Sequence, residues 1–247
     1  MVTLADLRVK IFADGAELEG IAAMYARPWI KGFTTNPTLM RKAGVPDHKE
    51  LALRVLQAVP DRPVSLEVFA DDFDEMERQA LEIASWGRNV YVKIPVTSTG
   101  GQFAGPLIRR LTSAGVQVNV TALLTLDQVK AVTESLAADT PTVISVFAGR
   151  IADTGVDPVP IMREALKIMR VRPQAELIWA SPREILNIVQ ADEIGCHIIT
   201  VTADILRKIS LLGKDHDQYS LETVQMFHRD ALAAGYAIPV TLRAGSA

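Results

Sequence analysis

The sequence predicts a (β/α)8 barrel, and three observations support this. Short runs rich in β-branched residues alternate with longer amphipathic segments along the whole chain. Eight such strand and helix units fit into 247 residues, and about 250 residues is typical of this barrel. No low-complexity stretch or proline-rich linker divides the chain, so we expect one barrel domain over residues 1–247.

The predicted strands are LRVKIFAD (7–14), IKGFTT (30–35), VSLEVFA (64–70), NVYVKIPV (89–96), VQVNVTA (116–122), TVISVFA (142–148), AELIWAS (175–181) and HIITVTA (197–203). Helical patterns lie between them, among them 72–87, 101–115 and 157–171. Asp72 and Asp157 are expected helix starts, and Gly87 and Gly115 are expected helix ends. A doubly wound open sheet is the alternative, but it favours a glycine-rich turn after the first strand, and residues 14–17 (Asp-Gly-Ala-Glu) are not one.

Composition excludes several classes of protein. The net charge of −3 provides no basic surface for nucleic acid. No run approaches the roughly 20 apolar residues of a membrane span, and the N-terminus lacks a signal-peptide pattern. The single cysteine, Cys196, cannot form an internal disulfide, and we expect it to be buried filler. A cytoplasmic protein is the expectation.

Strand parity locates a candidate site, because successive side chains of a strand face opposite sides. In 64–70, 90–96 and 116–121 the β-branched residues share the face that suits the outer helices. The other face carries Glu67, Lys93, Asn119 and Thr121. Buried charges cost several kcal/mol unless they are paired. These residues also lie near the C-terminal strand ends, where barrel active sites are found.

Two plainer interpretations remain open at this point. Lys93 and Glu67 can form an ion pair with a purely structural role. Asp14, at the end of the first strand, can cap the helix that follows.

The segment SLETVQMFHRDALAAGY (220–236) is surplus to a barrel and predicts an extra C-terminal helix at about 217–236. Leu221, Val224, Phe227, His228 and Leu232 follow a helical spacing, so the helix has a face to bury. It can pack on its own barrel, or it can serve as an oligomerisation or lid element. We expect a homo-oligomer formed through this helix.

Six sequence blocks occur in order: GFTTNPTLM (32–40), SLEV (65–68), YVKIPVT (91–97), NVTALL (119–124), ISVFAGRIAD (144–153) and ASPR (180–183). Together they resemble the transaldolase family, including its small fructose-6-phosphate aldolase branch. The resemblance runs from about residue 9 to residue 212. Two departures concern the sugar and phosphate pockets. After Asp14 the family commonly has a small hydroxyl residue followed by an alanine and an acid, whereas this chain has Gly15-Ala16-Glu17. Pro182 stands where an aromatic residue is common.

The resemblance implies a role for each matching position. Lys93 matches the lysine that forms a Schiff base with the substrate ketone, and Asp14 matches the acid/base. Glu67 and Thr121 match the pair that positions a catalytic water. The matching substrate-binding positions are Thr35, Asn36, Asn119, Ser145 and Phe147 around the dihydroxyacetone unit, and Arg150, Ser181 and Arg183 around the phosphate.

The chemistry explains why these residue types are needed. Cleaving a C–C bond beside a ketone requires an acceptor for two electrons, and a lysine iminium provides it. The amine must be neutral to attack, and an apolar strand favours the neutral form. Arginine binds two phosphate oxygens through its planar fork. No step needs a metal or another cofactor, and the sequence has no Cys/His cluster with ligand spacing.

The resemblance implies a cytoplasmic transaldolase of the pentose phosphate pathway. It would move dihydroxyacetone from a ketose phosphate, such as fructose 6-phosphate or sedoheptulose 7-phosphate, to an aldose phosphate. Within the family, Glu67 and Phe147 resemble the transferases, whereas the aldolase branch tends to have glutamine and tyrosine there. The alternatives are an aldolase that releases dihydroxyacetone, the same transfer on a differently substituted (for example sulfonated) sugar, and a barrel that binds sugar phosphates without turnover.

Overall fold

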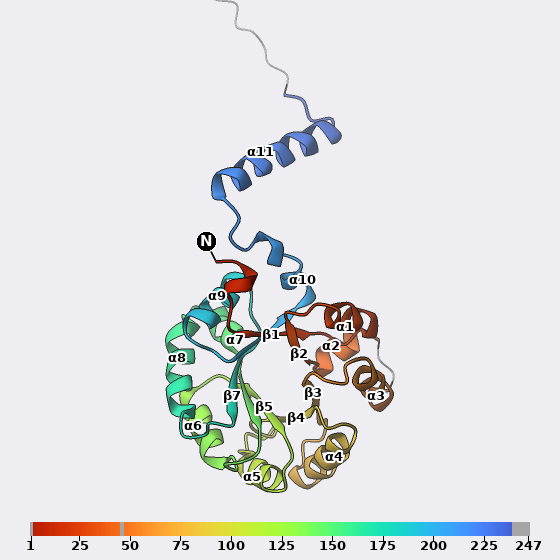
Figure 1. Ribbon diagram of the computed structural model, residues 1–247, viewed down its shortest axis with the longest axis vertical. Coiled ribbons are helices and arrows are strands. Elements are labelled where there is room, and N and C mark those ends of the chain that lie inside the picture. The colour runs from red at the N-terminus through yellow and green to blue at the C-terminus, as the bar shows by residue number, and fades with distance from the viewer. Residues whose placement is uncertain (1, 45–46, 239–247) are drawn as a thin grey trace, which may run out of the picture.

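The computed structural model describes residues 2–44 and 47–238 and forms a closed barrel of eight parallel strands in chain order (Figure 1). The strands are β1 (Lys10–Asp14), β2 (Ile30–Thr34), β3 (Val64–Glu67), β4 (Val90–Pro95), β5 (Val118–Leu123), β6 (Thr142–Val146), β7 (Ala175–Trp179) and β8 (Ile198–Thr202). The predicted (β/α)8 barrel is confirmed, and the open sheet is excluded because β1 pairs with β8.

Helices surround the barrel (Figure 1). They are α1 (Leu18–Tyr25), α2 (Pro37–Lys42), α3 (His48–Ala58), α4 (Phe73–Ser85), α5 (Gly105–Ser113), α6 (Leu126–Ser135), α7 (Ala148–Asp153), α8 (Pro158–Met169), α9 (Leu186–Glu193), α10 (Ala203–Leu206) and α11 (His216–Ala233), with 3₁₀ turns η1 (Leu4–Asp6) and η2 (Ile209–Leu211). Within the described ranges, none of these helices combines the length and the apolar character needed to cross a bilayer.

The predicted helix signals act as expected at several ends. The Asp72 side chain accepts from the backbone N–H groups of Asp74 and Glu75 at the start of α4. Asp157 accepts from Val159 N at 3.0 Å at the start of α8. Gly115 follows α5 with a φ of +80°, a left-handed conformation that glycine adopts without strain.

The main core lies between the strands and the outer helices. The predicted apolar faces of β3, β4 and β5 fill it with side chains such as Val64, Val92 and Val120, which are completely buried. A smaller cluster fills the barrel interior, where Phe12 packs with Val143, Ile178, Ala180 and Ile198. The barrel is therefore a packed core rather than a pore.

Helix α11 stands apart from the barrel (Figure 1). None of its residues is buried, and Val224, Phe227 and Leu232 are 61%, 63% and 67% exposed. The alternative that this helix packs on its own barrel is therefore wrong. The helix ends at Ala233, before the predicted position 236, because Gly235 adopts a left-handed φ of +67°.

Candidate active site

A cavity of about 880 Å³ opens at the C-terminal ends of the strands. Among the residues that line it are most of those predicted from the sequence: Asp14, Asn36, Glu67, Lys93, Asn119, Thr121, Ser145, Phe147, Arg150, Ser181 and Arg183. These side chains come from strands or loops all around the barrel. The parallel register brings them together, because it places every strand's C-terminal end at the same mouth.

Lys93 lies on β4 and is the buried lysine among the residues that the structure describes. It is 7% exposed, and its Nζ lies 2.9 Å from Glu67 Oε2 and 2.8 Å from the Thr35 carbonyl oxygen, to which it donates. Glu67 is its register partner on β3. The ion pair considered from the sequence therefore exists, and both of its members line the cavity. Both side chains can therefore contact a molecule bound in the cavity.

Amide and hydroxyl groups form a second network beside Lys93. Asn119 is completely buried and pairs in register with Lys93. Its Nδ2 donates to Ser65 Oγ at 3.0 Å, and its Oδ1 accepts from Ser145 Oγ at 2.7 Å. These two bonds hold the Asn119 amide in place between the Ser65 hydroxyl on β3 and the Ser145 hydroxyl on β6.

A β-bulge shapes the mouth at β5. The register with β6 shifts between Val120 and Leu123, and Ala122 adopts a φ of +67°. Such a left-handed alanine costs roughly 1–3 kcal/mol and is found mainly at functional sites. The bulge lies directly beside Thr121, and both Thr121 and Ala122 line the cavity.

Asp14 does not cap helix α1, whose N-cap residue is Glu17. Asp14 Oδ1 instead accepts a 2.7 Å hydrogen bond from Thr34 Oγ1. Burial raises the pKa of the Asp14 carboxyl, while Thr34 and then Lys93 act to lower it and Glu67 adds to the rise. Asp14 is therefore a carboxyl group that holds a proton more readily than an exposed aspartate does.

Asn36 lies at the start of α2 and has two roles. Its Oδ1 accepts from Leu39 N at 2.9 Å, which caps the helix, and its side chain lines the cavity. The cap uses the amide oxygen, so the Nδ2 group is the part of the side chain that can donate to a ligand.

Arginines from two neighbouring loops meet at one side of the cavity. The Arg150 guanidinium lies 5.1 Å from the Phe147 ring centroid. Arg183 Nη1 donates to Ser181 Oγ at 3.1 Å, and Arg183 also forms a two-point ion pair with Asp153. This side of the cavity therefore carries two cations, one of which already has a carboxylate partner.

Gly149 lets these two loops approach each other. A Cβ atom at Gly149 would lie 1.5 Å from the Ser181 carbonyl oxygen, so no other residue fits without movement of the backbone. Ser181 itself has a φ of +60°. The close approach holds Ser181 and Arg183 beside the helix that carries Arg150.

One residue predicted to bind substrate lies outside the cavity lining, and the lining contains further residues that were not predicted. Thr35 is not among the residues that line the cavity, because it lies on the opposite phase of its strand from Thr34; its hydroxyl donates to the Ser65 carbonyl at 3.3 Å. Its part in the site is the backbone carbonyl that accepts from Lys93. Other lining residues were not predicted from the sequence; they include Thr34, Lys42, Asp153 and Thr200. Inward parity on the second and eighth strands is the signal that points to both threonines.

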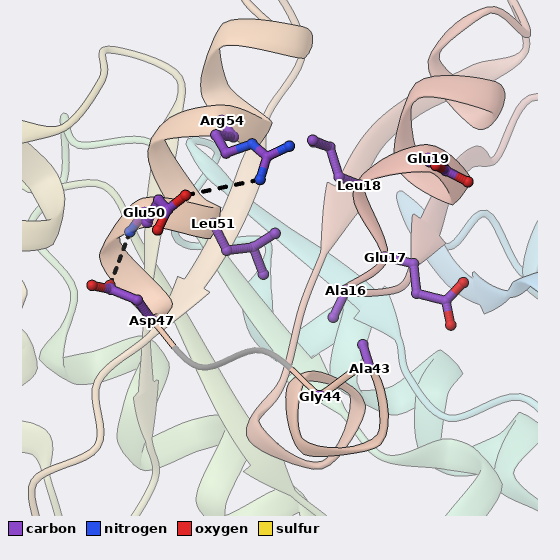
Figure 2. A pocket seen from close by; sticks show the side chains of 10 residues that line it. All are labelled: Ala16, Glu17, Leu18, Glu19, Ala43, Gly44, Asp47, Glu50, Leu51 and Arg54. Carbon is purple, nitrogen blue, oxygen red and sulfur yellow. Dashed lines mark hydrogen bonds and ion pairs between the residues drawn. The ribbon is translucent and has the colours of Figure 1, made fainter.

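A smaller hollow of about 490 Å³ lies outside the barrel, between α1 and the α2–α3 region (Figure 2). Its polar groups are largely occupied by local contacts: Asp47 caps α3 by accepting from Glu50 N, and Arg54 lies 3.9 Å from Glu50. Figure 2 shows the carboxylates of Glu17 and Glu19 pointing away from Arg54. None of the predicted site residues lies there.

The model of the family described as transaldolase/fructose-6-phosphate aldolase matches residues 11–238. The chain belongs to this family. Named relatives agree with this. A protein named "Probable transaldolase" from Dehalococcoides mccartyi is 34% identical over 202 residues, which cover 81% of this chain and 90% of the relative. "Probable transaldolase 2" from Listeria monocytogenes is 33% identical, with coverage of 81% and 88%.

Solved structures share the fold of this transaldolase-family chain. The crystal structure of 2,3-dimethylmalate lyase aligns with a TM-score of 0.54 at 13% identity, covering 96% of this chain and 90% of that one. KGPDC from Streptococcus mutans aligns with a TM-score of 0.55 at 11% identity, with coverage of 80% and 89%. At such identities the likeness concerns the barrel alone.

Proposed function

We propose that this protein is a transaldolase that transfers a dihydroxyacetone unit from a ketose phosphate to an aldose phosphate through a Schiff base on Lys93. One observation carries the proposal: a buried lysine amine lies at a cavity of about 880 Å³, together with the carboxylates of Asp14 and Glu67, two asparagines and two arginines. Family membership supports the reaction class.

Schiff-base formation begins at Lys93. The neutral amine adds to the ketone carbon, and the carbinolamine then loses water to give an iminium ion. Glu67, at 2.9 Å from the amine, is close enough to take up the proton that Lys93 must lose. Thr121, which also lines the cavity, would hold the leaving water together with Glu67.

Cleavage requires a base beside the substrate, and Asp14 is our candidate. The C3–C4 bond breaks as Asp14 takes the proton of the C4 hydroxyl, and the bonding electrons move into the iminium to form an enamine. The raised pKa of Asp14 brings this carboxyl closer to the range in which it can both accept and return a proton. Asn36 and Asn119 would hold the hydroxyl groups of the enamine.

The acceptor aldehyde then completes the transfer. The enamine carbon attacks the aldehyde carbon, Asp14 returns its proton to the new hydroxyl, and water hydrolyses the iminium to release product and free Lys93. Arg150, Ser181 and Arg183 would bind the phosphate through charge-assisted hydrogen bonds.

Phe147 favours transfer over release of dihydroxyacetone. It lines the cavity and offers no hydroxyl to deliver water or a proton to the enamine. An enamine shielded in this way persists until an aldehyde arrives. A tyrosine, as is common in the aldolase branch, would supply such a hydroxyl.

A single assay with fructose 6-phosphate tests the assignment, by measuring transfer product and free dihydroxyacetone with and without an acceptor aldose phosphate. We expect product formation to depend on the acceptor. Equally fast cleavage without any acceptor would replace the transferase by the aldolase. Turnover confined to a sulfonated sugar would retain the Schiff-base transfer and show that the substrate carries a sulfonate in place of the phosphate.

The C-terminal helix is proposed as the contact between copies of this chain. Val224, Phe227 and Leu232 on α11 are each more than half exposed, and an apolar surface of this kind typically marks an interface. Most of the stability of a helix in a protein comes from packing of its apolar face, so contact with a second chain would stabilise α11.

A further inference from the structure

We propose that Thr200 on β8 is a positioning residue for Asp14 and acts through the hydroxyl of Thr34. The inference rests on the proposed function, because it requires Asp14 to exchange a proton with the substrate. Thr200 is not part of the six sequence blocks on which the family resemblance was recognised.

Three neighbouring strands supply the residues. Thr34 on β2 pairs in register with Asp14 on β1, and Thr200 on β8 pairs with Phe12, two residues before Asp14. Thr34 Oγ1 lies 2.7 Å from Asp14 Oδ1 and 2.5 Å from Thr200 Oγ1. Both hydroxyls are buried, and both threonines line the cavity. The two hydroxyls form a hydrogen-bonded series that runs from Thr200 through Thr34 to the carboxyl group of Asp14.

Counting protons fixes the direction of this series. A threonine hydroxyl has one proton to donate. Thr34 donates its proton to Asp14, so the contact between the two threonines must be filled by the proton of Thr200. Both donors therefore point toward Asp14 Oδ1. That oxygen remains an acceptor, which leaves Oδ2 as the oxygen that takes the substrate proton.

The groups around Asp14 allow the hydrogen bonds from Thr200 and Thr34 to affect its pKa. The charged groups nearest in the site are Lys93 on β4, which favours the ionised carboxyl, and Glu67 on β3, which opposes it. From β2 and β8, hydroxyls rather than charges reach Asp14 in the described structure. Lys42, Arg150, Asp153 and Arg183 lie farther round the cavity.

Each hydrogen bond in such a series polarises the next, so Thr34 is a stronger donor while Thr200 donates to it. The hydrogen bond from Thr34 lowers the pKa of Asp14, against the larger rise caused by burial. Without Thr200 the hydrogen bond from Thr34 lowers the pKa of Asp14 less, so that pKa rises. The acid limb of the pH–rate profile should then move to higher pH, and kcat at neutral pH should fall.

The competing explanation is that Thr200 is a packing residue whose hydroxyl happens to be satisfied. The two explanations differ on which reaction step fails. Schiff-base formation on Lys93 precedes cleavage and does not use the proposed proton transfer to Asp14. A positioning residue therefore affects cleavage and spares adduct formation, whereas distorted packing affects both.

The experiment compares Thr200→Val with Thr200→Ser and with the matched control Thr142→Val. Thr142 is a buried strand threonine on β6, outside the cavity, whose Oγ1 has no hydrogen-bond partner in the described part of the chain. We would measure kcat across a range of pH, together with borohydride trapping of fructose 6-phosphate on Lys93. Thr200→Ala removes the same hydroxyl with less bulk, should the valine variant fail to fold.

We expect Thr200→Val to lower kcat about 3- to 10-fold, the size expected from losing one hydrogen bond between neutral groups, and to move the acid limb of the pH–rate profile upward. Trapping should match that of the natural protein, and Thr200→Ser and Thr142→Val should stay within about twofold of its kcat, since serine keeps the donor. An unchanged pH profile and kcat in Thr200→Val, or a parallel loss of trapping, overturns the proposal while leaving the Schiff-base function in place. A natural protein that traps no adduct overturns both.

Discussion

The amine of Lys93 lies 2.9 Å from Oε2 of Glu67, its direct register partner on the adjacent strand. Pairing offsets much of the desolvation cost that each buried charge would otherwise carry. It also gives Lys93 a nearby proton acceptor. The structural and the catalytic interpretations of these two residues are thus compatible, because one contact serves both.

Asp14→Asn should abolish most activity, by about 10²- to 10⁴-fold, because a general acid/base is lost. It should also make the protein more stable at neutral pH. Burial raises the pKa of Asp14 above its ordinary value of 3.8, so the folded state binds more protons than the unfolded state in the interval between the two values. Stability therefore falls as pH rises through that interval, and asparagine escapes this loss.

The measurement is denaturant unfolding of the natural protein and Asp14→Asn at several pH values. The stabilisation of the variant should be full at neutral pH and shrink toward pH 3.8, where the unfolded-state carboxyl also becomes protonated. A stabilisation that grows as pH falls would contradict this account of Asp14.

Arg150→Ala and Arg183→Ala should each weaken the binding of phosphorylated substrates by about 2–5 kcal/mol, since a charged partner of the bound phosphate is lost. Global stability should change little for Arg183→Ala, because its ion pair with Asp153 is about half exposed (46% and 52% for the two side chains) and such pairs contribute about 0–1 kcal/mol. The exposed Arg163→Ala on α8 is the control. Unchanged KM values in both variants would place the anion site elsewhere.

Phe147→Tyr, alone and combined with Glu67→Gln, should raise the ratio of free dihydroxyacetone to transfer product. The new hydroxyl lies at the cavity and can deliver a proton to the enamine, which then hydrolyses instead of waiting for an aldehyde. Both products are measured in one reaction, with Phe227→Tyr on the exposed face of α11 as the control. A ratio that stays constant would show that Phe147 does not protect the enamine.

Deleting the residues after Gly213 should reduce the particle size in solution from an oligomer to a single chain. The reason is that α11 leaves Leu221, Val224 and Phe227 open to solvent, without contact to its own barrel. Light scattering measures the change. A charge at the apolar face, Phe227→Asp, should act in the same direction, whereas Gln225→Asp should not; equal particle sizes throughout would end the oligomer proposal.

Much of the barrel could be predicted because its rules are local. Alternation along 64–70, 90–96 and 116–121 placed Glu67, Lys93 and Asn119 on the inner face, where the structure has them. The cap residues Asp72 and Asp157 were readable for the same reason. Strand ends were less certain: the first strand begins at Lys10 rather than residue 7, because an apolar run does not reveal where pairing starts.

Other features depend on long-range contacts that no local pattern encodes. The Arg183–Asp153 pair joins two loops, and the close approach of Gly149 to Ser181 exists only once β6 and β7 lie side by side. The same holds for Thr200 on β8, whose hydroxyl meets that of Thr34 on β2, the strand on the other side of β1. The predicted contact of the Thr35 side chain with substrate stays a prediction, and the contact with Lys93 through the Thr35 backbone carbonyl is a long-range one that no local pattern indicates.

The most direct test of the central claim is borohydride reduction in the presence of fructose 6-phosphate, followed by peptide mass analysis of the natural protein and of correctly folded Lys93→Ala. We predict a stable adduct on Lys93 in the natural protein, and neither adduct nor turnover in the variant. An adduct on another lysine, or appreciable turnover by folded Lys93→Ala, would contradict the account.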